Sequence, residues 1–106
     1  MYQMAQTFKL LPGRYAEYRK AHDELWPELA AAMQACGVNM VIYHYRDRLF
    51  LYATAPSREA FERSHQGPVA ARWAAHMASM METHPDGTAI VEELEQAFAF
   101  GAFRSE

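Results

Sequence analysis

The chain has 106 residues, of which 51% are hydrophobic and 22% charged, a composition that fits one folded domain over residues 1–106 and excludes wholesale disorder. Ten Lys and Arg against 13 Asp and Glu give a formal net charge of -3 without a long basic run, so nucleic acid is a poor candidate partner. The single cysteine, Cys36, excludes an intramolecular disulfide and a cysteine-based zinc cluster.

The first segment, residues 2–10, is predicted to be a strand. Its apolar side chains at Tyr2, Met4, Phe8 and Leu10 alternate with more polar ones, as in a strand with one buried face. The segment lacks the basic and apolar regions of a signal peptide, and no stretch of about 18 apolar residues predicts a membrane span. We therefore expect a cytoplasmic protein that does not enter a membrane.

Residues 14–36 change to helical spacing. Pro27 interrupts this helix because it has no amide to donate to the carbonyl of Asp23, so a kink or a restart is predicted there. Gly37 stands where a glycine commonly ends a helix. The side chains that recur at three- and four-residue steps form one stripe, consisting of Tyr18, His22, Leu25, Leu29 and Met33.

The middle of the chain predicts a hairpin followed by two helices. Residues 38–46 and 49–55 are rich in β-branched, aromatic and aliphatic side chains, and Asp47-Arg48 is short enough to be the turn between them. Ser57 is a candidate N-cap for a helix over residues 58–65. Gly67-Pro68 then breaks the helix, which resumes to about residue 82 with a second stripe of Val69, Trp73, Met77 and Met80/Met81.

The last segment, residues 89–103, fits either a helix or a strand. If it is a strand, the order becomes strand–helix–strand–strand–helix–strand, which is the βαββαβ pattern of a ferredoxin-like α+β fold with helices on one face of an antiparallel sheet. The other face would expose an apolar patch, so we expect two sheets to pair in a homodimer, as a dimeric α/β barrel, with help from Phe98, Phe100 and Phe103.

His22 and Tyr18 are the first candidates for chemistry. They lie one helical turn apart on the same face, and an imidazole beside a phenol suits proton transfer to and from sugar hydroxyls or carbonyls. The alternative is a half-buried histidine that only bonds a neighbour. Trp26 and Trp73 pose a similar choice between core packing and the wall of a sugar site.

The sequence lacks the marks of a metal or nucleotide enzyme. The remaining histidines show no metal-ligand spacing, and five glycines form neither a phosphate-binding loop nor a dinucleotide fingerprint. We therefore expect no metal and no cofactor.

The run over residues 11–29, which contains Glu17-Tyr18-Arg19-Lys20-Ala21-His22-Asp23-Glu24-Leu25-Trp26-Pro27-Glu28-Leu29, resembles the L-rhamnose mutarotase family. Later pieces fit in the same order, namely Gly37 with Asn39, Ile42-Tyr43, Leu49-Phe50, Arg72-Trp73, Met77 and His84-Pro85-Asp86.

This resemblance implies a cytoplasmic dimer that interconverts the anomers of a 6-deoxy sugar without metal or cofactor. The family's acid/base histidine matches His22, and a substrate-binding tyrosine matches Tyr18. The small-molecule partner would be the sugar itself, with Trp26 and Trp73 among the residues around it. The other interpretations are a small cofactor-independent monooxygenase on a dimeric α/β barrel and a sugar-binding protein without catalysis.

Two departures from the family fall at positions that the resemblance places against the sugar. Met40 stands where the family has a tyrosine after its asparagine, and Ala74 stands where it tends to have a second tryptophan. The acid/base residues are kept while the recognition residues differ, which favours the same reaction on another sugar, such as L-fucose instead of L-rhamnose. His76 and Tyr43 are candidates for a replacement contact.

Overall fold

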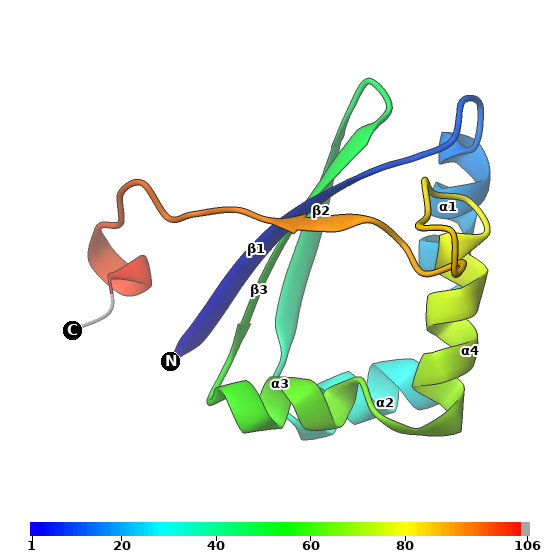
Figure 1. Cartoon of the computed structure of the whole chain (residues 1–106). Helices are drawn as coiled ribbons and strands as arrows, with labels where there is room; N and C mark the ends of the chain where they lie inside the picture. Colours follow the sequence, from blue (N-terminus) through cyan, green and yellow to red (C-terminus); the bar gives the residue numbers. More distant parts are fainter. Residues whose placement is uncertain (105–106) are drawn as a thin grey trace.

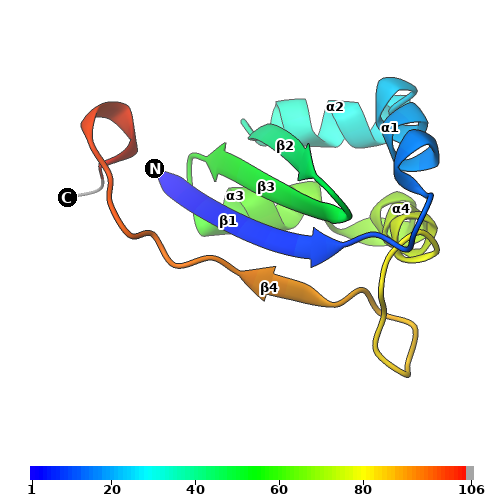
Figure 2. The ribbon, with the colours of Figure 1, turned by 90° about the horizontal axis from the view of Figure 1, so that it is seen from above.

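A four-stranded antiparallel sheet lies at the centre of the computed structural model, which describes residues 1–104 (Figure 1). The strand order is β2 (Asn39–Tyr45), β3 (Arg48–Ala55), β1 (Tyr2–Lys9) and β4 (Val91–Glu93). Figure 2 shows the short β4 along the outer edge of β1, opposite β3. Strands distant in sequence therefore hold the centre of the sheet, as the ferredoxin-like prediction requires.

Four helices pack against one face of this sheet (Figures 1 and 2). They are α1 (Tyr15–Asp23), α2 (Pro27–Ala35), α3 (Arg58–Ser64) and α4 (Gly67–Ala78). The predicted α+β order is confirmed, with each of its two helical segments divided into a pair of helices. Within residues 1–104, no helix is long and apolar enough to cross a membrane.

The division between α1 and α2 follows from Pro27. A residue before proline is pushed out of the helical region, and Trp26 is extended, with φ -61° and ψ 130°. Pro27 then occupies the first turn of α2, where a missing amide costs no hydrogen bond. The Trp26 carbonyl accepts hydrogen bonds from the amides of Leu29 and Ala30, at 3.1 and 3.0 Å. The predicted restart at this proline is confirmed.

The predicted helix cap and helix stop are also confirmed. The Ser57 hydroxyl accepts a hydrogen bond from the amide of Ala60 at 3.1 Å, which satisfies a free donor at the start of α3. Gly37 follows α2 with a left-handed φ of +71°, and the amide of Val38 donates to the Met33 carbonyl at 3.0 Å. A glycine is needed here because its conformation disfavours any side chain.

Two predicted boundaries are wrong. The hairpin turn consists of Arg46 and Asp47, one residue earlier than expected, and Arg46 takes the left-handed conformation, φ 57°, that glycine usually supplies. The fourth helix ends at Ala78 instead of residue 82. Met81 instead forms an isolated antiparallel bridge with Leu10, because this stretch pairs with the end of the first strand.

The core lies between the sheet and the helices. The alternation predicted for residues 2–10 is confirmed, since Phe8 and Leu10 are buried on the helix-facing side. Phe8 packs against the ring of Tyr18 on α1, with ring centroids 6.5 Å apart. The buried residues that form one cluster are Phe8, Leu10, Tyr18, Leu49, Met77, Met80 and Met81.

None of the helices α1 to α4 covers the other face of the sheet, and large side chains stand exposed on it. Its register places Val41, Tyr43 and Tyr45 of β2 on this side, and the tyrosines are 67% and 64% exposed. We call this surface the open face.

The last segment, predicted as either helix or strand, is a strand only at Val91–Glu93. Beyond it the chain extends away from the helices (Figure 1) and ends in a short 3-10 helix, η1 (Gly101–Phe103). The side-chain amide of Gln3 donates to the Phe103 carbonyl at 2.6 Å, and the Tyr52 and Phe103 rings meet edge to face. Phe98 and Phe100 are exposed, at 81% and 76%.

Candidate active site

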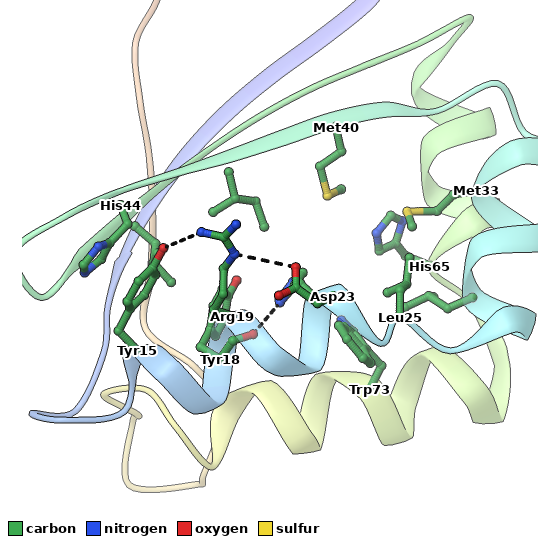
Figure 3. Close-up of a pocket in the computed structure, with 14 residues that line it drawn as sticks. Tyr15, Tyr18, Arg19, Asp23, Leu25, Met33, Met40, His44, His65 and Trp73 are labelled. Atoms are coloured by element: carbon green, nitrogen blue, oxygen red, sulfur yellow. Dashed lines mark hydrogen bonds and ion pairs between the residues drawn. The ribbon is translucent and has the colours of Figure 1, made fainter.

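A cavity of about 440 Å³ lies between the helix-facing side of the sheet and the helices (Figure 3). Its volume falls within the range of about 300–1,000 Å³ that is typical of small-molecule sites. The residues that line it come from α1, α2, β2, β3, α4 and the loops beside them, and are Tyr15, Tyr18, Arg19, His22, Asp23, Leu25, Leu29, Met33, Met40, Ile42, His44, Leu49, His65 and Trp73.

The stripe predicted for residues 14–36 faces this cavity. All five of its members, Tyr18, His22, Leu25, Leu29 and Met33, are lining residues. They remain together although the helix is broken, because α2 restarts with its own apolar side toward the same space. The shared face was therefore predicted correctly from spacing.

His22 is held in one tautomer. Its Nδ1 lies 3.0 Å from the backbone carbonyl oxygen of Tyr18, one turn earlier on α1. A carbonyl can only accept, so Nδ1 carries the proton and donates it. In the neutral ring Nε2 is then unprotonated, which makes it the nitrogen that can take a proton from a bound molecule.

Tyr18 lies directly beside His22. The ring centroids are 4.4 Å apart, and only 5% of Tyr18 is exposed. Burial raises the pKa of the Tyr18 hydroxyl well above its ordinary value, because a phenolate would lose its hydration there. Tyr18 therefore stays protonated and can donate a hydrogen bond to an oxygen in the cavity.

Trp73 and Trp26 take different places. Trp73, on α4, lines the cavity and meets the His22 ring at 5.2 Å with an interplanar angle of 78°. Trp26 does not line the cavity and lies behind Trp73, at 5.1 Å and 80°. The structure thus brings Trp73 to the cavity together with His22 and Tyr18. Trp26 contacts Trp73 but does not line the cavity.

Of the two departures from the family pattern, the structure brings one to the cavity. Met40 lines it from β2. Ala74 is exposed on α4 and lies outside the lining. The two candidates for a replacement contact are also elsewhere, since Tyr43 lies on the open face and His76 packs against Trp26 at 6.2 Å.

Sequence reasoning missed a polar group at one end of the cavity. Arg19 donates to the Tyr15 hydroxyl at 3.5 Å and pairs with Asp23, with 3.6 Å between Nε and Oδ1. The Tyr15 ring stacks on His44 of β2, with centroids 3.6 Å apart and planes within 7°. Figure 3 shows these side chains together beside Tyr18.

Part of this group could have been found. Tyr15 precedes Tyr18 by three residues and so extends the predicted stripe, and His44 shares strand alternation with Met40 and Ile42. His65, which lines the opposite end, carried no such signal because it follows the end of α3.

One end of the cavity is lined mainly by polar side chains, and the other by two methionines and His65. Figure 3 shows Tyr15, Arg19 and His44 on one side, and Met33 and Met40 on the other. His22 and Tyr18 line the cavity as well. Within residues 1–104, no three His, Cys, Asp or Glu residues lie where they could hold a metal ion.

Comparison with known proteins agrees with the resemblance seen in the sequence. A family model described as L-rhamnose mutarotase matches residues 3–100. The L-rhamnose mutarotase of Agrobacterium fabrum is 37% identical over 97 residues, covering 89% of this chain and 91% of the relative. That of Jannaschia sp. is 40% identical over 89 residues, covering 81% and 86%. The crystal structure of L-rhamnose mutarotase from Formosa agariphila superposes with a TM-score of 0.79 at 26% identity, covering 95% and 100%.

Removal of the Tyr18 hydroxyl should change how stability depends on alkaline pH. Because the folded-state pKa is raised, the unfolded chain loses this proton first, so the folded state binds more protons above about pH 10 and stability falls as pH rises. In Tyr18→Phe the free energy of unfolding, measured by urea titration, should fall less steeply between about pH 10 and 12. Parallel curves for the two proteins would contradict the assignment.

Proposed function

The chain belongs to the L-rhamnose mutarotase family, whose members are isomerases, and we propose that it interconverts the α and β anomers of a 6-deoxy sugar by acid/base catalysis. The observation that carries this proposal is the fixed tautomer of His22 beside a protonated Tyr18 in a cavity of suitable size. This pair supplies a proton acceptor and a hydrogen-bond donor, which are the two groups that anomer exchange needs.

The reaction begins at the anomeric hydroxyl. Nε2 of His22 takes the proton from that oxygen while the bond between C1 and the ring oxygen breaks, which leaves an open-chain aldehyde. The imidazolium returns the proton to the former ring oxygen, so no proton is gained or lost. Rotation about the bond between C1 and C2 and closure by the reverse steps then give the other anomer.

Tyr18 stabilises the sugar oxygen that is not exchanging a proton with His22. Its raised pKa disfavours full loss of its proton, so it acts by donating a hydrogen bond that lowers the cost of charge on the leaving ring oxygen. His22 carries the proton in both directions. The roles differ because His22 must both accept and release a proton, whereas Tyr18 keeps its proton.

The two ends of the cavity favour a 6-deoxy sugar. Such a sugar has hydroxyl groups on one side and a methyl group in place of a terminal hydroxyl. The Arg19, Tyr15 and His44 end can bond hydroxyl groups, and the Met33 and Met40 end can pack against a methyl.

Met40 is the residue most suited to select among 6-deoxy sugars. A thioether is a weak acceptor and has no hydrogen to donate, so it cannot replace the phenol that the family resemblance places there. L-Rhamnose and L-fucose differ in the configuration of their hydroxyl groups. Loss of the phenol's hydrogen bond therefore changes which of the two sugars the site prefers. We propose that L-fucose is turned over faster than L-rhamnose.

We also propose that the protein acts as a homodimer, paired through the open face as a dimeric α/β barrel. The exposed Tyr43 and Tyr45 of β2 would be covered, and the segment beyond β4 would bring Phe98 and Phe100 against the partner. Contiguous apolar patches of this kind mark interaction surfaces. The cavity lies on the opposite side of the sheet, so pairing would leave it free.

Replacement of His22 tests the mechanism. In His22→Ala, anomer exchange should fall by roughly 10²–10⁴-fold, the usual contribution of a positioned proton-transfer group. Saturation-transfer NMR on L-rhamnose and L-fucose at equilibrium measures the rate. His84→Ala, in the exposed turn before β4, is the control and should keep the wild-type rate. Near-normal exchange in folded His22→Ala would show that this residue is not the proton carrier, as in a protein that only binds sugar.

A tyrosine at position 40 tests the origin of sugar choice. Met40→Tyr should raise the rate on L-rhamnose relative to L-fucose by up to about tenfold, because the phenol adds one hydrogen bond. Ala74→Trp should leave that ratio unchanged, because position 74 is outside the cavity. The account of specificity fails if the wild-type protein equilibrates L-rhamnose faster than every other aldose tested.

The molecular mass in solution and one charge substitution test the proposed dimer. Light scattering at micromolar concentration should give twice the mass of one chain, and Tyr43→Glu should shift the protein toward monomer, because it buries a charge in the paired faces. Gln34→Glu adds the same charge on the exposed side of α2 and should remain dimeric. A wild-type monomer, or Tyr43→Glu that dimerises as tightly as wild type, would contradict the open-face interface.

A further inference from the structure

Three aromatic side chains meet behind the cavity wall. Trp26 lies 5.1 Å from Trp73 and 6.2 Å from His76, and Trp73 lies 6.2 Å from His76. The Trp26 ring is nearly parallel to His76, at 12°, and nearly perpendicular to Trp73, at 80°. Ring centroids 4.5–7 Å apart in edge-to-face or offset-stacked arrangements are favourable aromatic contacts. We call these three residues the aromatic triad.

The helix break places Trp26 in the triad. In a continuous helix Trp26 would follow His22 by four residues and lie one turn beyond it on the same face. Instead α1 ends at Asp23, Trp26 is extended, and Pro27 begins α2. The indole therefore reaches across to α4, where Trp73 and His76 are one turn apart.

One member of the aromatic triad, Trp73, packs against the imidazole of His22. Trp73 meets that ring at 5.2 Å and 78°, while the Tyr18 ring lies 4.4 Å from it. The hydrogen bond from Nδ1 fixes one point of the imidazole but allows some rotation of the ring about it. The two aromatic neighbours limit that rotation. The Trp73 indole can do so only if it is itself held, and Trp26 is the aromatic ring packed behind it.

We infer that Trp26 is a positioning residue, which holds the Trp73 indole against the imidazole of His22 and so aims Nε2 at the sugar. The inference rests on the proposed function, and it differs from a role in sugar binding because Trp26 lies outside the cavity lining. A small misplacement of Nε2 slows proton transfer strongly, since a displacement of about 1 Å can reduce a rate by roughly 10²-fold.

The first test is kinetic. In Trp26→Leu, kcat for anomer exchange should fall by roughly ten- to a hundredfold while KM stays within about threefold of wild type, because the sugar contacts are intact and the proton transfer is misaligned. Trp26→Phe keeps a flat ring and should recover most of kcat. Tyr2→Leu removes an aromatic contact with Phe61 at 5.7 Å, outside the cavity lining, and should change neither constant.

The second test reads His22 directly and needs no activity. In ¹H–¹³C spectra of the histidine rings, Trp26→Leu should shift the His22 signals, while the signals of His84 stay where they are in wild type. Trp26→Phe should restore the His22 positions toward wild type. His22 signals that do not move in Trp26→Leu would overturn the inference. So would a rise in KM with unchanged kcat, which would make Trp26 a sugar-binding residue. Absence of exchange in the wild-type protein would count against the proposed function, while the shift of the His22 signals would still test the inference.

Discussion

The conformational restriction that Pro27 places on Trp26 is the constraint on which the site depends. It ends the first helical segment at Asp23 and lets a second helix start with proline in its first turn. The last turn of α1 thereby presents His22 to the cavity, and the extended residue between the helices turns its indole toward α4. A proline in the middle of a helix usually costs stability, but here it falls at a boundary where it costs little and determines which side chains meet.

The proposed chemistry of the site rests on two groups whose protons local structure places. A backbone carbonyl one turn earlier fixes the proton of His22 on Nδ1. Burial keeps the proton on the Tyr18 hydroxyl. Neither effect requires a charged partner next to the reacting atoms, and the ion pair of Arg19 with Asp23 is largely exposed, at 66% and 64% of their side chains. The site can therefore offer a bound molecule a proton acceptor and a hydrogen-bond donor without a charged side chain paired to either of them.

Periodicity predicted the elements and the shared face well, because it reports directly on which side chains an element turns inward. The five-residue stripe of the first helices and the buried side of β1 are examples. It failed where the answer depended on contacts between elements. Met80 and Met81 fit the helical stripe, but their backbones bond the residues that follow β1. Residues 97–100 are apolar but lie outside every helix and strand of the described chain.

The candidate site was predictable to a similar extent. His22, Tyr18 and Trp73, predicted from helical stripes, share a cavity with Met40, which the family resemblance placed at the site. The family resemblance placed Ala74 against the sugar beside Trp73, yet neighbours in a helix point about 100° apart, and Ala74 is exposed. His65 enters the lining only through the packing of the loop that follows α3, which no single stretch of sequence encodes.

The proposed mechanism depends on the tautomer of His22, which long-range ¹H–¹⁵N NMR of the imidazole reports. At about pH 8, where imidazoles are ordinarily neutral, the account predicts a proton on Nδ1, an unprotonated Nε2, and a shift of the Nε2 signal when L-fucose or L-rhamnose is added. A proton on Nε2, or an Nε2 signal that saturating sugar leaves unchanged, would contradict it.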